Sequence, residues 1–161
     1  MKILRVKMFK NLAFLVMAFT MLCLLSTPII GNAYTDGERQ YNFKVAASGG
    51  PSHYSEREFR NTTNTNNCWK VGMTTSTESN TVRSVTRFYL GVENSPYNAQ
   101  GSEMYKVIVR EEPKYYPSYT NALHKYVYLY ARDDTNTNKA YTATGIWDEE
   151  TGHAPSPNPW T

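Results

Sequence analysis

The sequence predicts an all-β protein, a two-sheet antiparallel sandwich of about six to seven strands preceded by a helical signal peptide. Three observations predict this fold. All 13 tyrosines lie after residue 33, together with many Thr and Val residues, and aromatic and β-branched residues favour strands. Apolar and polar residues alternate there in short runs at the spacings of sandwich strands. No long segment after residue 33 has the apolar period of a helix.

The first 33 residues have the organisation of a secretory signal peptide. An apolar segment, Leu12–Leu25, is followed by Gly31–Ala33, which ends in a small-x-small cleavage pattern. The basic residues that precede the apolar segment are Lys2, Arg5, Lys7 and Lys10. We expect cleavage after Ala33 and a secreted, extracellular chain. The alternative is that Leu12–Ile30 stays in the membrane as a spanning helix, which needs roughly 20 apolar residues.

Removal of this segment changes the charge balance. The chain has 17 Lys and Arg and 14 Asp and Glu, and four of the basic residues but no acidic residue precede Tyr34. The mature chain therefore has 13 basic and 14 acidic residues, which are scattered, so no nucleic-acid partner is expected. We expect one domain at 34–152 and an extended, unpaired Pro-rich tail at 153–161. Cys68, the one cysteine of the mature chain, is expected to be buried.

The alternation predicts strands at about 41–47, 69–73, 81–91, 103–110, 125–132 and 140–147. In the first three strands, the residues that share a face are Tyr41, Phe43, Val45 and Ala47; Trp69, Val71 and Met73; and Val82, Ser84, Thr86, Phe88 and Leu90. We expect Trp69 and Trp147 to be buried. Runs rich in Asn, Thr, Asp or Gly at 61–67, 95–101 and 133–138 predict loops.

The last three strands alternate in the same way. The fourth has Tyr105, Val107 and Val109 on one face, and the sixth has Tyr141, Ala143, Gly145 and Trp147 on one face. The fifth strand separates tyrosines from aliphatic residues, with Tyr126, Tyr128 and Tyr130 on one face and Val127, Leu129 and Ala131 on the other. Between the fourth and fifth strands the alternation fails, and residues 118–124 favour one helical turn.

Three short segments carry a resemblance. They are FRNTTN at 59–64, NCWKV at 67–71 and GIWDEET at 145–151. The chain resembles, over about residues 41–152, an uncharacterised family of small secreted proteins of Gram-positive bacteria that is catalogued as a domain of unknown function. In that family the position before the tryptophan is usually proline, so Cys68 is a departure. The resemblance implies export and a context of bacteriocin-like or competition systems, and it implies no cofactor or catalytic residue.

Residue patterns do not support an enzyme, a cofactor or a metal site. Asp134, Asn136 and Asn138 have the spacing that opens a calcium loop, but Lys139 and Gly145 stand where that loop needs Gly and Glu. An Asx-rich turn is therefore expected. The three histidines have no metal-ligand spacing. The neighbouring Glu111 and Glu112 point to opposite faces if they lie in a strand, so they do not form a convergent acid pair.

A binding function has more support. If the aliphatic face of the fifth strand is the core, Tyr126, Tyr128 and Tyr130 form an outward row suited to a cell-wall polymer or a surface protein. Trp147 and Asp148, followed by Glu149 and Glu150, are a second candidate, because adjacent carboxylates can hold a cation or, beside an aromatic ring, bind a sugar. The alternative reading of the tyrosines is cross-strand pairing without a ligand. The alternative function is a structural or matrix protein that self-associates through its tyrosines and Cys68.

Overall fold

The computed structural model describes residues 37–78, 84–92, 99–135 and 137–157. The predicted signal segment, residues 1–33, lies outside the described residues. Within the described part of the chain, no helix is long and apolar enough to cross a membrane. The helix that is described, the 3-10 turn η1 (Thr120–Ala122), falls where the sequence predicts a helical turn.

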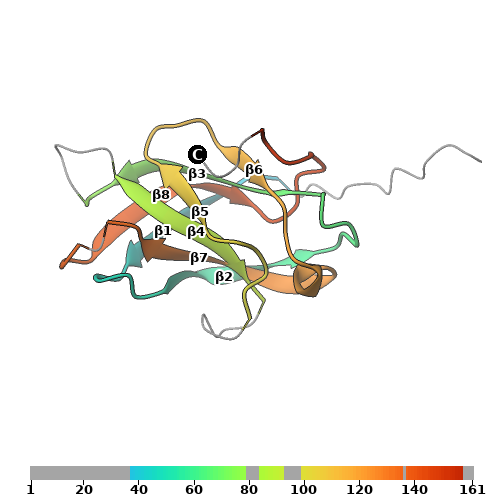
Figure 1. The fold of residues 1–161 in the computed structure, drawn as a ribbon, viewed down its shortest axis with the longest axis horizontal. Helices are drawn as coiled ribbons and strands as arrows, with labels where there is room; N and C mark the ends of the chain where they lie inside the picture. Colours follow the sequence, from blue (N-terminus) through green and yellow to red (C-terminus); the bar gives the residue numbers. More distant parts are fainter. Residues whose placement is uncertain (1–36, 79–83, 93–98, 136, 158–161) are drawn as a thin grey trace, which may run out of the picture. The chain divides into compact units, whose positions relative to one another are not determined.

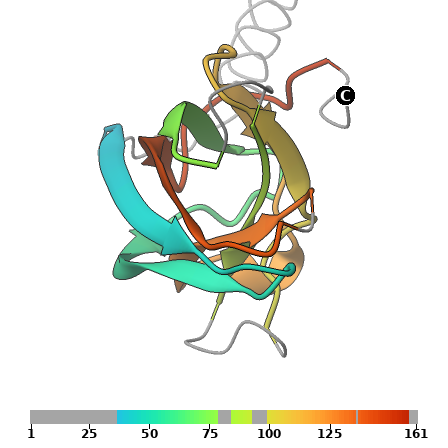
Figure 2. The same ribbon diagram turned by 90° about the vertical axis from the view of Figure 1, so that its left-hand side faces the viewer.

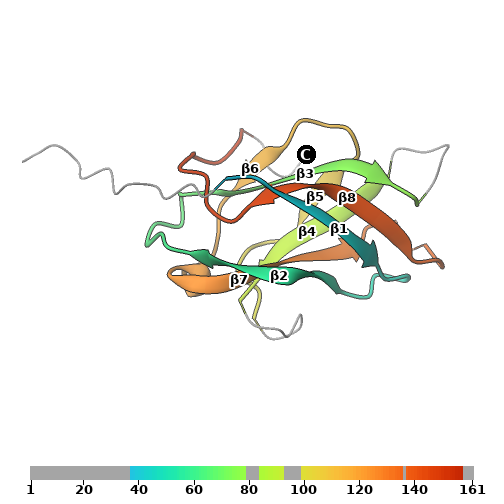
Figure 3. The same cartoon turned by 180° about the vertical axis from the view of Figure 1, so that it is seen from behind.

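The described residues form two antiparallel sheets. The first sheet has the order β1-β8-β3-β6 and the second has the order β2-β7-β4-β5. In chain order the strands are β1 (Arg39–Val45), β2 (Ser52–Arg60), β3 (Trp69–Ser76), β4 (Val85–Gly91), β5 (Tyr105–Ile108), β6 (Lys114–Tyr116), β7 (Lys125–Asp133) and β8 (Tyr141–Asp148). Figures 1 and 3 show the two layers from opposite sides, and Figure 2 shows them turned by 90°. The predicted two-sheet sandwich is confirmed.

One core fills the space between the sheets. Trp69 and Trp147 are both fully buried, as the alternation predicts. From the opposite sheet come Phe88, Leu90 and Leu129, which are also fully buried. Each fully buried large apolar side chain contributes roughly 1.5–3 kcal/mol to folding. The inward faces assigned from alternation are therefore correct in β1, β3, β4, β5, β7 and β8.

Two strands are absent from the sequence-based prediction. β2 has the polar sequence SHYSEREFR, and a bulge between His53 and Arg57 breaks its alternation. β6 has only three residues, too few to show a period. β5 is shorter than the predicted strand at 103–110, because the chain turns after Ile108 and Arg110 adopts a positive φ of 64°. The first residues of the predicted strand at 81–91 lie outside the described part of the chain.

In the first sheet, the side chain of a tyrosine passes over a glycine of the neighbouring strand. Tyr41 is paired with Gly145 of β8, and its hydroxyl donates a hydrogen bond of 3.1 Å to the carbonyl oxygen of Gly72 on β3. A Cβ at Gly145 would lie 2.0 Å from that same oxygen. Residue 145 is therefore glycine because the neighbouring backbone and the tyrosine occupy the space of a side chain.

The described part of the segment after Gly152, residues 153–157, is hydrogen-bonded to the rest of the protein, so the prediction of an unpaired tail is wrong there. The backbone N–H of Cys68 donates to the carbonyl oxygen of His153 at 3.0 Å. Ser156 donates from its N–H to the carbonyl of Tyr115 at 3.0 Å and accepts from the Tyr115 N–H, through Oγ, at 2.9 Å. These bonds satisfy the outer edge of β6, which an isolated edge strand would leave open.

Candidate binding face

The tyrosines of β7 point away from the core, as the sequence predicts. Val127, Leu129 and Ala131 are fully buried between the sheets. Because side chains alternate along a strand, the intervening tyrosines lie on the outer side of the second sheet. Their exposure falls along the strand: Tyr126 is 49% exposed, while Tyr128 is half-buried.

Tyr130 does not belong to the exposed row, and its predicted exposure is wrong. Its ring stacks on the ring of Tyr89, with centroids 5.2 Å apart and planes inclined by 18°. It also lies over Gly91, where an added Cβ would come within 2.0 Å of the ring. The missing side chain of Gly91 lets the ring lie flat on the sheet, so Tyr130 is fully buried although it is on the outer face.

β2 adds aromatic groups that the sequence prediction missed. Phe59 is paired with Tyr126 across the strands, with ring centroids 5.1 Å apart. Phe59 also lies 5.0 Å from the imidazole of His124, and His53 lies 5.8 Å from Tyr128. Arg57 and Phe59 are two residues apart, which is the spacing of residues on one face of a strand. The glutamates on either side of Arg57 make the segment polar, so no strand was predicted there.

The same outer side carries cations. The guanidinium carbon of Arg57 lies 4.3 Å from the centre of the Tyr126 ring, which is a cation–π contact. Further along the sheet, Arg87 is paired with both Arg132 and Lys106. Asp134 forms ion pairs with Arg87 and with Lys106, the latter at 3.1 Å.

The paired outward positions of the second sheet contain no carboxylate in the described strands, although Glu56 in the unpaired bulge of β2 is exposed. We call the outer side of this sheet, with Arg57, Phe59, Tyr126 and Tyr128 at its more exposed end, the aromatic–cationic face. Flat rings supply apolar area, and the cations supply electrostatic attraction for an acidic ligand.

Trp147 and Asp148 lie inside the protein, so neither is available at the surface. Trp147 is fully buried in the core, and Asp148 is 4% exposed. Asp148 accepts a hydrogen bond of 3.1 Å from the backbone N–H of Glu150. The prediction that these two residues form a binding site is therefore wrong.

A buried arginine explains this acidic segment. Arg60 at the end of β2 is fully buried and donates to the carbonyl oxygens of Glu149 and of Asn67, the latter at 2.6 Å. Burial lowers the pKa of Arg60, and the carboxylates of Glu150 and its neighbours oppose that effect. Burial raises the pKa of Glu150, although its carboxylate accepts a hydrogen bond of 2.7 Å from the Thr62 N–H. The segment therefore joins the ends of the two sheets.

Cys68 is buried, as expected. Burial raises the pKa of its thiol to about 11, so the reactive thiolate is scarce at neutral pH. Its carbonyl oxygen accepts from both the N–H and the hydroxyl of Thr151, each at 2.9 Å. The residue therefore has a structural role, because its backbone links the start of β3 to the segment that follows β8.

The Asp-rich turn after β7 caps its own backbone. Asp133 accepts hydrogen bonds from the backbone N–H and the hydroxyl of both Thr135 and Thr137. The neighbouring Asp134 pairs with cations, as described above. Asn136 lies outside the described residues. Among the residues that the structure describes, no group of three or more His, Cys, Asp or Glu side chains is placed to hold a metal ion.

Comparison with known proteins gives one match. No curated protein and no solved structure matches the chain. The family described as proteins of unknown function, DUF2712, matches residues 29–151, which includes all eight described strands. The chain therefore belongs to this family of proteins of unknown function.

Proposed function

We propose that this protein is a secreted, non-enzymatic binding module that attaches to an anionic cell-surface polymer through its aromatic–cationic face. One observation carries the proposal: Arg57 lies over the exposed ring of Tyr126, beside Phe59 and Tyr128, on a rigid sheet. A charged group over a ring that remains in water is available to a ligand at little cost of ordering.

The charge of the face favours an acidic partner. The mature chain is close to neutral overall, but the paired outward positions of the second sheet bear Arg57, Arg87, Lys106 and Arg132. Asp134 offsets part of this charge at the far end. A wall polymer built from polyols and phosphates offers both repeated negative charge and apolar sugar or polyol edges. Attachment to another cell is also the step that a competition protein requires.

Binding to purified poly(glycerol phosphate) tests the proposal. We expect the triple variant Arg57→Ser, Tyr126→Ser, Tyr128→Ser to bind at least tenfold more weakly and the wild type to lose affinity as salt is raised. Lys44→Ala is the matched control, because it removes an exposed cation from the outer side of the first sheet. Tyr130 is excluded from the variant, since its ring is buried.

Three results would contradict the proposal. The first is equal binding by the wild type and the triple variant, when both unfold at the same temperature. The second is multimerisation of the purified protein without a partner, which would favour the structural, self-associating alternative. The third is cleavage of the polymer, which would make the protein an enzyme.

Secretion is tested separately. The protein recovered from culture supernatant should begin at Tyr34 by mass spectrometry. Intact Met1 in the membrane fraction would instead show that the apolar segment is retained.

A further inference from the structure

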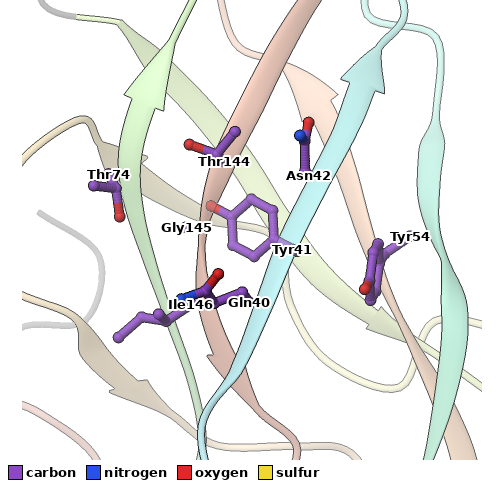
Figure 4. Close-up of a pocket in the computed structure, with 8 residues that line it drawn as sticks. All are labelled: Gln40, Tyr41, Asn42, Tyr54, Thr74, Thr144, Gly145 and Ile146. Atoms are coloured by element: carbon purple, nitrogen blue, oxygen red, sulfur yellow. The ribbon is translucent and has the colours of Figure 1, made fainter.

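The outer side of the first sheet carries a hollow of about 510 Å³. Figure 4 shows it over strands β1 and β8, with Thr74 of β3 on one side and Tyr54 of β2 on the other. Seven of its eight lining residues belong to the first sheet, and none of the eight belongs to the aromatic–cationic face, so binding here is independent of the function proposed above.

The chemistry of the lining is uniform. None of the eight described residues that line the hollow carries a charge. Its polar groups are the carboxamides of Gln40 and Asn42 and the hydroxyls of Thr74 and Thr144. Its apolar groups are Ile146 and the ring of Tyr54. Such a lining gives hydrogen-bond donors and acceptors without a preference for either sign of charge.

The strand register places these groups next to one another. Gln40 is opposite Ile146, and Asn42 is opposite Thr144. One polar–apolar pair and one polar–polar pair therefore lie side by side along one face. Thr74 reaches the same hollow because a bulge between Met73 and Thr75 shifts the register of β3. Bulges commonly redirect a side chain next to a binding site.

The frame of the hollow is rigid and the polar groups are available. Tyr41 and Gly145 also line the hollow, and the hydrogen bond from the Tyr41 hydroxyl to the carbonyl oxygen of Gly72 ties β1 to β3 across β8. Gln40, Asn42 and Thr74 make no side-chain hydrogen bond to another described residue, and all three are exposed. A ligand therefore has free partners on a fixed frame, which lowers the ordering cost of binding.

We propose that this hollow binds an uncharged saccharide that carries N-acetyl groups. The sugar hydroxyls match the amides and hydroxyls of the lining. The acetamido group has an N–H, a carbonyl and a methyl, which match the carboxamides of Gln40 and Asn42 and the side chain of Ile146. The Tyr54 ring offers a flat apolar edge to the pyranose.

Calorimetric titration with tetra-N-acetylchitotetraose tests this site, with cellotetraose as the matched sugar that lacks acetamido groups. We expect saturable binding of the first sugar and at least tenfold weaker binding of the second. The double variant Gln40→Ala, Asn42→Leu removes two hydrogen-bonding groups and should weaken binding by about tenfold or more.

Two control variants make the result specific. Lys44→Ala changes an exposed residue of β1 that does not line the hollow, and it should bind the sugar like the wild type. Tyr126→Ser changes only the aromatic–cationic face and should also leave sugar binding unchanged, even if polymer binding fails. The proposal is overturned if the wild type does not bind the N-acetylated sugar, if cellotetraose binds equally well, or if the folded double variant binds like the wild type.

Discussion

The two sheets share one core but present different outer sides to solvent. The second sheet carries rings and cations, with Arg57 over Tyr126 and Phe59 beside it. The first sheet carries neutral amides and hydroxyls around a hollow, with Gln40 and Asn42 at its edge. Inner positions are restricted by packing, whereas outer positions can vary without loss of the fold. The difference between the outer sides is therefore consistent with the two different ligands proposed above.

The largest effect should come from the shared core and be alike for both sheets. Trp147→Ala in the first sheet and Phe88→Ala in the second each remove a fully buried ring and should destabilise the protein by about 3–5 kcal/mol. Denaturant unfolding measures both. A loss confined to one variant would mean that the other sheet does not depend on the common core.

A smaller loss of stability should distinguish two glycines, each of which lies under a tyrosine side chain. In Gly145→Ala the new methyl meets backbone, the carbonyl oxygen of Gly72 at 2.0 Å, so strands must separate and we expect about 3 kcal/mol of destabilisation. In Gly91→Ala it meets the Tyr130 ring, which can swing into solvent, so we expect about 1–2 kcal/mol. Thermal unfolding of both variants checks the order, and a larger loss at Gly91 would contradict it.

The carboxyl groups at the ends of β7 and β8 should respond oppositely to pH. Burial opposes ionisation of Asp133, but hydrogen bonds from Thr135 and Thr137 outweigh it and lower the pKa below 3.8. Its stabilisation is therefore present above about pH 3.8 and lost as the pH falls through the lower folded value. Burial raises the pKa of Glu150 above 4.5, so its contribution declines as the pH rises from about 4.5 through the folded value.

Unfolding midpoints measured between about pH 2 and 7 test this contrast. Asp133→Asn should make stability less sensitive to acid at the low end of the range. Glu150→Gln should remove part of the decline above about pH 4.5. The same change of slope in both variants would contradict the assignment of opposite shifts.

The last prediction involves no change in stability. Chemical labelling of the folded protein compares the reactivity of an exposed side chain with that of a buried one. Tyr126 is 49% exposed and should be nitrated readily in the folded protein. Cys68 is buried with a pKa of about 11 and should not react with a thiol reagent at pH 8 until the chain unfolds. Cys68→Ser gives the background signal of the thiol reagent. Fast labelling of Cys68 in the folded state would show that its site opens.

Much of the fold could be predicted because alternation is a local property of strands. The inner faces of β1, β3, β4, β5, β7 and β8 follow from residues two apart, such as Val127 and Leu129. β2 was missed because its inner face is itself polar: Glu58 pairs with Arg39 of β1 at 3.0 Å, and Arg60 is buried among carbonyl oxygens. A strand whose inward residues are charged and paired has the polar composition of a loop, so its sequence does not indicate a strand.

The candidate face could be predicted only in part for a related reason. The outward direction of Tyr126 and Tyr128 follows from alternation alone. The burial of Tyr130 depends on Tyr89 and Gly91, which are about 40 residues distant in sequence, and no local pattern reveals it. The segment after Trp147 looks solvated in the sequence because Arg60, which donates to the backbone carbonyl oxygen of Glu149, is 89 residues away along the chain.

That separation also bears on when the protein can fold. Arg60 joins Glu149, and β1 pairs with β8, so early and late parts of the chain must meet before either sheet end is closed. Such distant contacts make folding slow compared with local hairpins. Among the described strands β1 is hydrogen-bonded to β8 alone, so β1 gains its sheet partner only when residues 141–148 are present. If the chain is exported, as proposed above, this order of assembly would delay closure of the two sheets until the late strands have left the translocation channel.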